Sequence, residues 1–504
     1  MSLYTDASLI MFPSGYKEDK IYSLKPTDGS GDLTFTRAST ATRVNAEGLI
    51  ETASVLGSEL ITNGDFATDT IWVKGTGTTI SGGKANLSNG NAVALYQDIG
   101  TQSGLVEVTF TVTNYTSGTL NVYSGSNQSA TDINVVANAL GTYTFNVIRT
   151  GGNANIIFGS LSNFTGSIDN VSIKEVITLN VPRIDYTSGC GSLLLEPQRT
   201  NEVTYSSEFN NAAWSKVNAT VTANYGISPD GTQNADRIQF TTASTSSVYR
   251  AIGGATTDAN SIYVKGVAGE KVLFGYGGNI SVGTLFTLNG EWQRLEAIST
   301  TGAVYHIGNY SGGTATDILL YGAQREVGSY STSYIPTLAS SVTRLADTAS
   351  KTGISSLINS TEGVLYAEIA AFNDQTLNNW ISISEDANIN NNQFNLRYVA
   401  ANNLIQVVSR AAGLGQDVVL NYTLTDKTAL NKIAIKYKVN DWALWVNGVE
   451  VDTETSSTAF TANSLDVLDF NRGNDSNFFY GKVQNIMVFP TALSDAELAT
   501  LTTL

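Results

Sequence analysis

Three carboxylates at alternate positions near the C-terminus form the pattern in this sequence that could support catalysis. Glu450, Asp452 and Glu454 stand in the run EVDTE. Alternate residues of a β-strand point to one face, so the three could line one cleft as nucleophile, helper and general acid of a glycoside hydrolase. The plainer alternative is that they face water on the second strand of a hairpin, because a short pattern arises easily among 44 acidic residues. We therefore expect no enzyme activity and keep a glycan-degrading endoglycosidase as the alternative.

The single histidine and the single cysteine offer little other catalytic chemistry. His306 lies in AVYHIGNY on an expected strand, and any serine–histidine triad or histidine-containing zinc site would have to use it. We expect a satisfied or half-exposed side chain there. Cys190 lies between two glycines, where we expect a small packed residue in a turn.

Tryptophans are the side chains most suited to binding, because sugar C–H faces stack on rings while hydroxyls need placed polar partners. Most tryptophans of a β-sandwich nevertheless belong to its core. Trp442 and Trp445 differ in parity, so we expect Trp442 in the core and Trp445 on the opposite face. The candidates for glycan binding are Trp445, Trp380, Trp214 and Trp72.

Composition indicates the elements that must position these residues. The chain has 504 residues, of which 42% are hydrophobic and 14% charged. Abundant Thr, Ser, Asn and Gly beside Val, Ile, Tyr and Phe is typical of strands joined by tight turns. We predict an all-β protein made of tandem β-sandwich or jelly-roll domains. One short helix is expected at residues 492–501, where Ser494 and Glu497 have capping-box spacing.

Charge and hydropathy argue against two kinds of partner. A net charge of −16 and a pI near 4.5 disfavour nucleic acid, whose phosphates are bound mainly by Lys and Arg, and disfavour an anionic membrane surface. No apolar run reaches the about 20 residues of a membrane span, and the N-terminus lacks the pattern of a signal peptide. We expect synthesis in a cytoplasm, without membrane insertion.

Two distant segments are predicted to form one connector. Residues 33–51 (LTFTRASTATRVNAEGLIE), the first segment, and residues 181–201 (VPRIDYTSGCGSLLLEPQRTN), the return segment, are each too short to fold alone. We predict that they touch, with Leu193, Leu194 and Leu195 buried among the strands of the first segment. The predicted units are an N-terminal attachment and connector segment (1–54), an inserted jelly roll (55–177), the return half of the connector (178–201), a second sandwich (202–340) and a C-terminal sandwich (341–504).

A hairpin and a repeat are also visible in the sequence. WALWVNGVEVD predicts two strands joined at Asn447 and Gly448, both with positive φ. The inserted unit opens with NGDF followed by Trp72 and closes with IDNVSIKEV, and the second sandwich opens with SSEFNNAAW and closes with DILLYGAQREV. This similarity suggests two copies of one module.

These stretches resemble known families. NGDF, the tryptophan that follows and IDNVSI are similar to the galactose-binding-like jelly rolls of family 4 and 9 carbohydrate-binding modules. That resemblance implies a structural calcium ion near Asp65 and Asp169, whose oxygens suit it; the alternative, which we favour, is that both residues fill turns. No other cofactor is expected. The VNG hairpin and the closing YGKVQNIMVFPTALSDAEL resemble concanavalin A-like, laminin-G-like lectin domains, and EVDTE has the spacing of endoglucanases with that fold.

The combination resembles the tail-fibre and head-fibre proteins of tailed bacteriophages. The first segment, the return segment and AQREVGSYSTSYIPT carry the resemblance; the jelly roll inserted after Glu51 departs from it. It implies a non-enzymatic fibre or decoration protein on the virion surface, made in the host cytoplasm and commonly homotrimeric. Its N-terminal segment would meet other virion proteins, and its sandwiches would bind host cell-surface glycans. A bacterial surface adhesin is a further alternative, for which a secretion signal would be expected.

Overall fold

The chain forms two compact units of β-structure. The computed structural model describes residues 3–88, 93–100, 103–125, 135–149, 155–159, 163–242, 244–253, 257–300, 302–372, 378–386, 390–400 and 402–503. One unit is Ser54–Thr178, and the other joins Met1–Ala53 to Leu179–Leu504. Strands dominate, and over the described residues the α-helical structure is the C-terminal α1 (Asp495–Thr502), so the predicted all-β class is confirmed. No helix in these ranges is long and apolar enough to cross a membrane.

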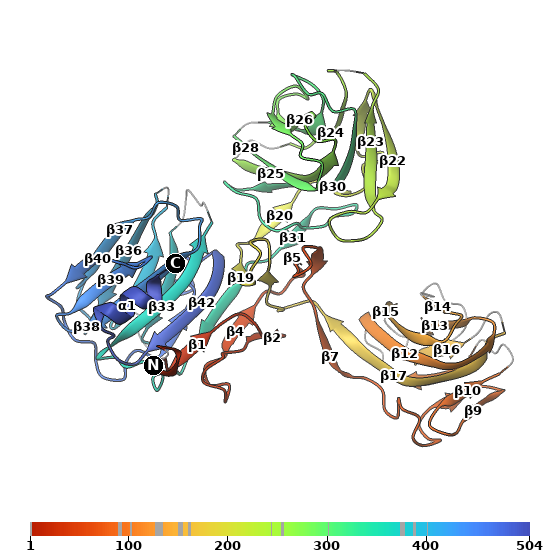
Figure 1. The fold of residues 1–504 in the computed structure, drawn as a ribbon, viewed down its shortest axis with the longest axis horizontal. Helices are drawn as coiled ribbons and strands as arrows, with labels where there is room; N and C mark the ends of the chain where they lie inside the picture. Colours follow the sequence, from red (N-terminus) through yellow and green to blue (C-terminus); the bar gives the residue numbers. More distant parts are fainter. Residues whose placement is uncertain are drawn as a thin grey trace. The chain divides into compact units, whose positions relative to one another are not determined.

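The C-terminal sandwich has two sheets around one hydrophobic core (Figure 1). Its eight-stranded sheet contains β1 (Leu9–Met11), β18 (Ile184–Asp185), β19 (Ser192–Leu195), β33 (Glu362–Ala371), β38 (Asn431–Lys438), β39 (Trp442–Val446), β40 (Val449–Glu454) and β42 (Gly481–Phe489). Its nine-stranded sheet contains β2 (Tyr16–Lys17), β3 (Lys20–Ile21), β4 (Leu33–Thr36), β32 (Thr348–Lys351), β34 (Asn379–Ser384), β35 (Gln393–Tyr398), β36 (Leu404–Arg410), β37 (Val419–Thr423) and β41 (Val467–Asp469). The predicted hairpin joins β39 to β40, with positive φ at Asn447 and Gly448.

The N-terminal and return segments are built into this sandwich instead of forming a separate connector. β1 and β19 both pair with β42, which Figure 1 shows beside β1, and β4 pairs with β32. Leu193 and Leu195 are buried in the sandwich core as predicted, but their strand partner is β42 and not the first segment. Local patterns cannot reveal such partners, because the paired strands lie far apart in the sequence.

The predicted contact between the first and return segments is confirmed. β5 (Thr42–Val44) and β6 (Ile50–Thr52) form a small ribbon in the first segment. The backbone N–H of Val44 donates to Asp185 Oδ2 at 3.0 Å, and the N–H of Tyr186 donates to the Val44 carbonyl at 3.0 Å.

The inserted unit and the second sandwich have the same topology. In the insert, one sheet runs β15 (Gly141–Arg149), β12 (Gly104–Ser117), β17 (Thr165–Ile177), β10 (Ala85–Leu87), β9 (Thr78–Ile80), with β7 (Val55–Glu59) also on β17, and the other runs β14 (Val135–Ala137), β13 (Leu120–Ser124), β16 (Asn155–Gly159), β11 (Leu95–Asp98), β8 (Val73–Lys74). In the second sandwich, the matching orders are β28 (Gln293–Ser299), β25 (Asp258–Gly266), β30 (Asp317–Val327), β23 (Ala235–Phe240), β22 (Ala219–Gly226) and β27 (Thr284–Thr287), β26 (Lys271–Gly277), β29 (Val304–Gly308), β24 (Ser247–Ala251), β21 (Ser215–Val217). The predicted repeat of one module is therefore confirmed.

The same tryptophan contact occurs in both modules. Trp72 Nε1 donates to the Asn63 carbonyl and Trp214 Nε1 to the Tyr205 carbonyl, each at 2.9 Å and each nine residues earlier in the chain. Each indole also packs on a nearby phenylalanine ring, with centroids 5.4 Å and 4.7 Å apart. The similar sequences at the start of the two modules therefore place a tryptophan at the same position in each hydrophobic core.

Candidate functional site

Five charged side chains are buried together where the first segment, the return segment and the start of the C-terminal sandwich converge. Arg37, Arg183, Glu196, Arg344 and Asp347 are each at most 2% exposed. Asp347 binds Arg37 at 2.9 Å and also binds Arg183, while Glu196 binds Arg183 at 2.6 Å and Arg344 at 2.7 Å. The N–H of Glu196 donates to Asp347 at 2.8 Å. We call these five residues the junction network.

Burial and neighbouring charges shift the pKa values of Arg37 and Glu196 in the junction network. Burial lowers the pKa of Arg37 to about 10, although the charge of Asp347 raises it. Burial alone would raise the pKa of Glu196, but the charges of Arg344 and Arg183 and hydrogen bonds from Ser333 hold it well below its ordinary value. Removing one member would leave a partner buried without a counter-charge, which is strongly destabilising.

The junction network comes from the stretches that stood out in the sequence. Arg37 belongs to TFTRAST, Arg183 to VPRIDY and Glu196 to LLLEPQRTN. Ser333, from SYSTSY, donates its N–H to Glu196 Oε1 at 2.7 Å. The role of these stretches in the structure is therefore to hold three parts of the chain together.

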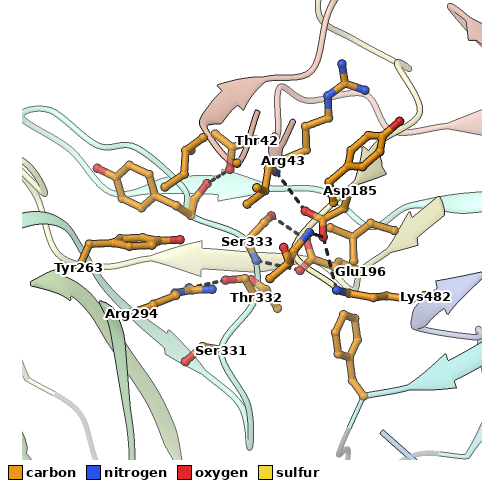
Figure 2. Close-up of a pocket in the computed structure, with 18 residues that line it drawn as sticks. Thr42, Arg43, Asp185, Glu196, Tyr263, Arg294, Ser331, Thr332, Ser333 and Lys482 are labelled. Atoms are coloured by element: carbon orange, nitrogen blue, oxygen red, sulfur yellow. Dashed lines mark hydrogen bonds and ion pairs between the residues drawn. The ribbon is translucent and has the colours of Figure 1, made fainter. Parts of the chain in front are cut away.

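A cavity of about 450 Å³ adjoins the junction network (Figure 2). Tyr263, Arg294 and Ser331 lie on one side of it, and Asp185 and Lys482 on the other. Its charged groups are already engaged: Lys482 Nζ lies 3.4 Å from Asp185 Oδ1, and Arg294 Nη2 donates to the Thr332 carbonyl at 2.5 Å. The cavity has the size of a small-ligand site, and two of its buried polar atoms, Arg294 Nε and Ser331 Oγ, form no hydrogen bond with any described residue.

The outer face of the nine-stranded sheet also carries buried polar groups without partners. Alternate residues of β34, β35 and β36 point inward to the core, such as Ile381, Leu396 and Val407. The residues between them face outward, and we call this the polar face: Trp380, Ser382, Ser384, Gln393, Asn395, Arg397, Gln406 and Arg410. The outer face of the other sheet is instead apolar, where Trp445 and Phe489 pack with Leu498 of α1.

Five atoms of the polar face are buried and form no hydrogen bond with any described residue. They are Trp380 Nε1, Ser384 Oγ, Asn395 Oδ1, Arg397 Nε and Gln406 Oε1. The strand register groups four of them, since Arg397 lies opposite both Trp380 and Gln406 and Asn395 is two residues from Arg397, whereas Ser384 lies at the far end of the face. Buried polar groups nearly always have partners, so this cluster is arranged to bind water or a ligand.

The chain after β41 folds over part of the polar face. Ser382 Oγ donates to the Asn471 carbonyl at 2.9 Å, and Gln393 Nε2 donates to the Arg472 carbonyl at 2.5 Å. Arg472 thereby joins Arg397 beside the indole of Trp380, with guanidinium carbons 5.3 Å and 5.0 Å from the ring centroid. Trp380 is 7% exposed, so its surroundings are largely closed.

An acidic group flanks the polar face. Asp469 lies opposite Ser382 on the neighbouring strand β41. Burial raises its pKa to about 6, with further contributions from the charges of Asp475 and Asp386. The polar face thus has this carboxylate at its side, Arg397 at one end and Arg410 at the other.

None of the four tryptophan candidates offers a free ring. Trp72, Trp214 and Trp445 are 5%, 1% and 7% exposed and belong to hydrophobic cores, and Trp380, also 7% exposed, lies against Arg397 and Arg472. The opposite faces of Trp442 and Trp445 are found as expected, but the side of Trp445 is covered by α1. The four predictions of glycan stacking are therefore corrected, because packing hides the rings.

Asp65 lies in a turn as expected, but Asp169 lies inside β17, opposite Thr111 beside a β-bulge, so the turn expected at Asp169 is wrong. Asp65 Oδ1 accepts a hydrogen bond from the Ala67 N–H at 3.3 Å, and Asp169 Oδ1 accepts one from Asn170 at 2.7 Å. Within the described ranges, no three His, Cys, Asp or Glu side chains gather as metal ligands would. Calcium at this place stays a prediction from the resemblance.

Cys190 is exposed and not packed, whereas His306 is fully buried. The Nε2 of His306 lies 2.7 Å from the Val282 carbonyl, and burial lowers the pKa of the imidazole.

The three carboxylates of EVDTE do not share one face. A β-bulge places Glu450 opposite Trp445 but Asp452 opposite Leu444, and those two partners lie on opposite faces of the sheet. Asp452 Oδ2 instead accepts the N–H of Asn421 at 2.7 Å. The alternation on which the cleft hypothesis depends is broken at Val451, which sequence alone did not indicate.

The arginines of the polar face were missed from the sequence. Gln393, Asn395 and Arg397 alternate with core residues in NQFNLRYV, a period of two that could have indicated a polar face. No local pattern places Arg472 beside Trp380, because a loop brings it there.

Comparisons with known proteins extend these findings. A search of curated proteins gives no match. Solved structures that resemble the chain include the CBM40 of the Ruminococcus gnavus IT-sialidase bound to α2,3-sialyllactose (18% identity, 29% of this chain and 83% of that chain, TM-score 0.25). Others are a leech intramolecular trans-sialidase (20%, 29% and 24%, 0.25) and domain 4 of the Geobacillus stearothermophilus arabinanase AbnA (11%, 35% and 83%, 0.26). Such TM-scores are too low to say more about this chain. Residues 363–499 match the concanavalin A-like lectin/glucanases superfamily, so the C-terminal sandwich is a domain of that kind.

Proposed function

We propose that this protein is a non-enzymatic glycan-binding protein of a bacteriophage fibre or virion decoration, and that its polar face contacts host-surface glycans. The observation that carries glycan binding is the set of five buried polar atoms without partners on the polar face, four of them at or near Trp380. Both donors and acceptors are among them, which suits the hydroxyls of a sugar. The match of residues 363–499 to a lectin and glucanase superfamily supports the same proposal.

The test of glycan binding uses the intact protein on a glycan array that includes bacterial surface polysaccharides. Trp380→Phe removes the indole N–H and should weaken binding of whichever glycan is retained. Trp72→Phe is the matched control, because it changes a buried tryptophan in the separate inserted unit. An intact protein that binds no glycan, or equal binding by both variants, would refute the proposal. Release of reducing ends from a bound polysaccharide would refute its non-enzymatic part.

The fibre assignment rests on the resemblance of the first segment, the return segment and residues 323–337 to phage fibre proteins. We propose a homotrimer attached to other virion proteins through the N-terminal segment. Immunogold labelling of virions should mark an external appendage, and mass measurement in solution should give three copies. A stable monomer, or label absent from the virion, would contradict this part.

A further inference from the structure

The arginines beside Trp380 are held close together without counter-charges. Arg397 comes from β35, directly opposite Trp380, and Arg472 comes from the chain after β41. Burial lowers the pKa of Arg397, and the nearby charge of Arg472 lowers it further. Two like charges near one indole repel each other, so the arrangement favours a negative group between or beside them.

The missing counter-charges distinguish these arginines from most others in the chain. Over the described part of the chain, eight arginines form ion pairs: Arg37, Arg43, Arg183, Arg199, Arg237, Arg294, Arg325 and Arg344. Over the described residues, neither Arg397 nor Arg472 lies within ion-pair distance of a carboxylate. A chain with 44 acidic residues and a net charge of −16 has carboxylates to spare, so two unpaired guanidinium groups at one place indicate a site for an external anion.

Two of the unpartnered atoms at this end are hydrogen-bond donors. Trp380 Nε1 and Arg397 Nε each carry one hydrogen and have no acceptor among the described residues. Asn395 Oδ1 and Gln406 Oε1, on the same face, are acceptors without donors. An anionic group would satisfy the donors, and neighbouring sugar hydroxyls would satisfy the acceptors.

We propose that the polar face selects acidic glycans, with the carboxylate or sulfate of the sugar bound by Arg397 and Arg472 beside Trp380 and sugar hydroxyls bound by Asn395 and Gln406. This inference rests on the proposed glycan binding and adds its substrate class. The carboxylate of Asp469, opposite Ser382 on the neighbouring strand β41, would repel the anionic group and so favour its placement on the side of the two arginines.

The experiment is binding of the intact protein to an oligosaccharide array with neutral, carboxylated and sulfated members, followed by calorimetry with the best ligand. We expect retained glycans to be acidic, and binding to weaken as salt concentration rises. Methyl esterification of a retained carboxylated glycan should abolish binding, while retention of sulfated members alone would identify sulfate as the anion.

Arg397→Gln and Arg472→Gln should each weaken binding about tenfold or more, because each removes a charge-assisted hydrogen bond. Arg397→Lys, which keeps the charge without the planar fork, should lose less. Arg237→Gln is the matched control, since Arg237 also lies over a ring, that of Tyr225, but is paired with Asp317 in another sandwich. Unchanged thermal unfolding of each variant shows that the loss is not misfolding.

Two outcomes separate this inference from the proposed function. Binding only of neutral glycans, or binding unaffected by both glutamine variants, would overturn the acidic specificity and leave glycan binding intact. Failure to bind any glycan would overturn both.

Discussion

Replacing Asp347 by asparagine tests whether the junction network holds the larger unit together. Asp347 is 1% exposed and accepts bonds from Arg37 at 2.9 Å, from Arg183 and from the N–H of Glu196 at 2.8 Å. Asparagine keeps the shape but removes the charge that both arginines face. Breaking a buried ion pair in this way costs about 3–5 kcal/mol. Because burial already lowers the pKa of Arg37 to about 10 against the effect of Asp347, we expect the upper half of that range.

Urea unfolding followed by tryptophan fluorescence measures this change. Asp317→Asn is the control, because Asp317 and its partner Arg237 are partly exposed and such a pair contributes about 0–1 kcal/mol. Unfolding of Ser54–Thr178, a separate compact unit, should not change in either variant. If Asp347→Asn unfolds within 1 kcal/mol of the unmodified protein, by the same criterion as the control, the network is not what stabilises this junction.

Three further predictions follow from the same structure. Because the pKa of Glu196 is lowered in the folded state, its contribution to stability is present above its unfolded pKa of about 4.5 and is lost as pH falls below that value. In Glu196→Gln this loss of stability in acid should be smaller, which urea unfolding between pH 7 and pH 3 would measure. The pH dependence from Asp469 has the opposite sign, because its raised pKa of about 6 means that the folded state loses stability as pH rises through that value. Asp469→Asn should therefore stabilise the protein by about 1–2 kcal/mol at pH 7 and have no effect at pH 4. An equal gain in stability at both pH values would show that the buried charge of Asp469 is not the cause. Replacing residues 55–177 by a short Gly-Ser linker should leave glycan binding unchanged. The two ends of the insert lie on paired strands, with Val55 opposite Ile177, so a short linker can join the flanking chain. Lost binding would show that the insert takes part in it.

Local patterns predicted the features that depend on neighbouring residues. The all-β class, the turn at Asn447 and Gly448, and the C-terminal helix with Ser494 and Glu497 all follow from short-range preferences, and each is found. The module repeat was also visible, because both copies use a tryptophan at the same place in the core.

Features set by distant partners could not be predicted in this way. The sequence indicated that the first and return segments touch, but not that β42 is the partner of both β1 and β19. The bulge at Val451 reversed the expected side of one carboxylate, and α1 covered Trp445. Arg472 reached Trp380 through a loop, so the site emerged only when the fold was known.

The pairing of β1 with β42 also bears on how the chain is made. Leu9 pairs with Val488, which is synthesised 479 residues later. At about 5–20 residues per second, β1 waits roughly 25–95 s for its partner. During that time, the two jelly-roll modules can fold as complete units, while β1 lacks its strand partner. A chaperone that binds nascent chains would therefore be expected to contact β1 and to leave only after β42 has been synthesised.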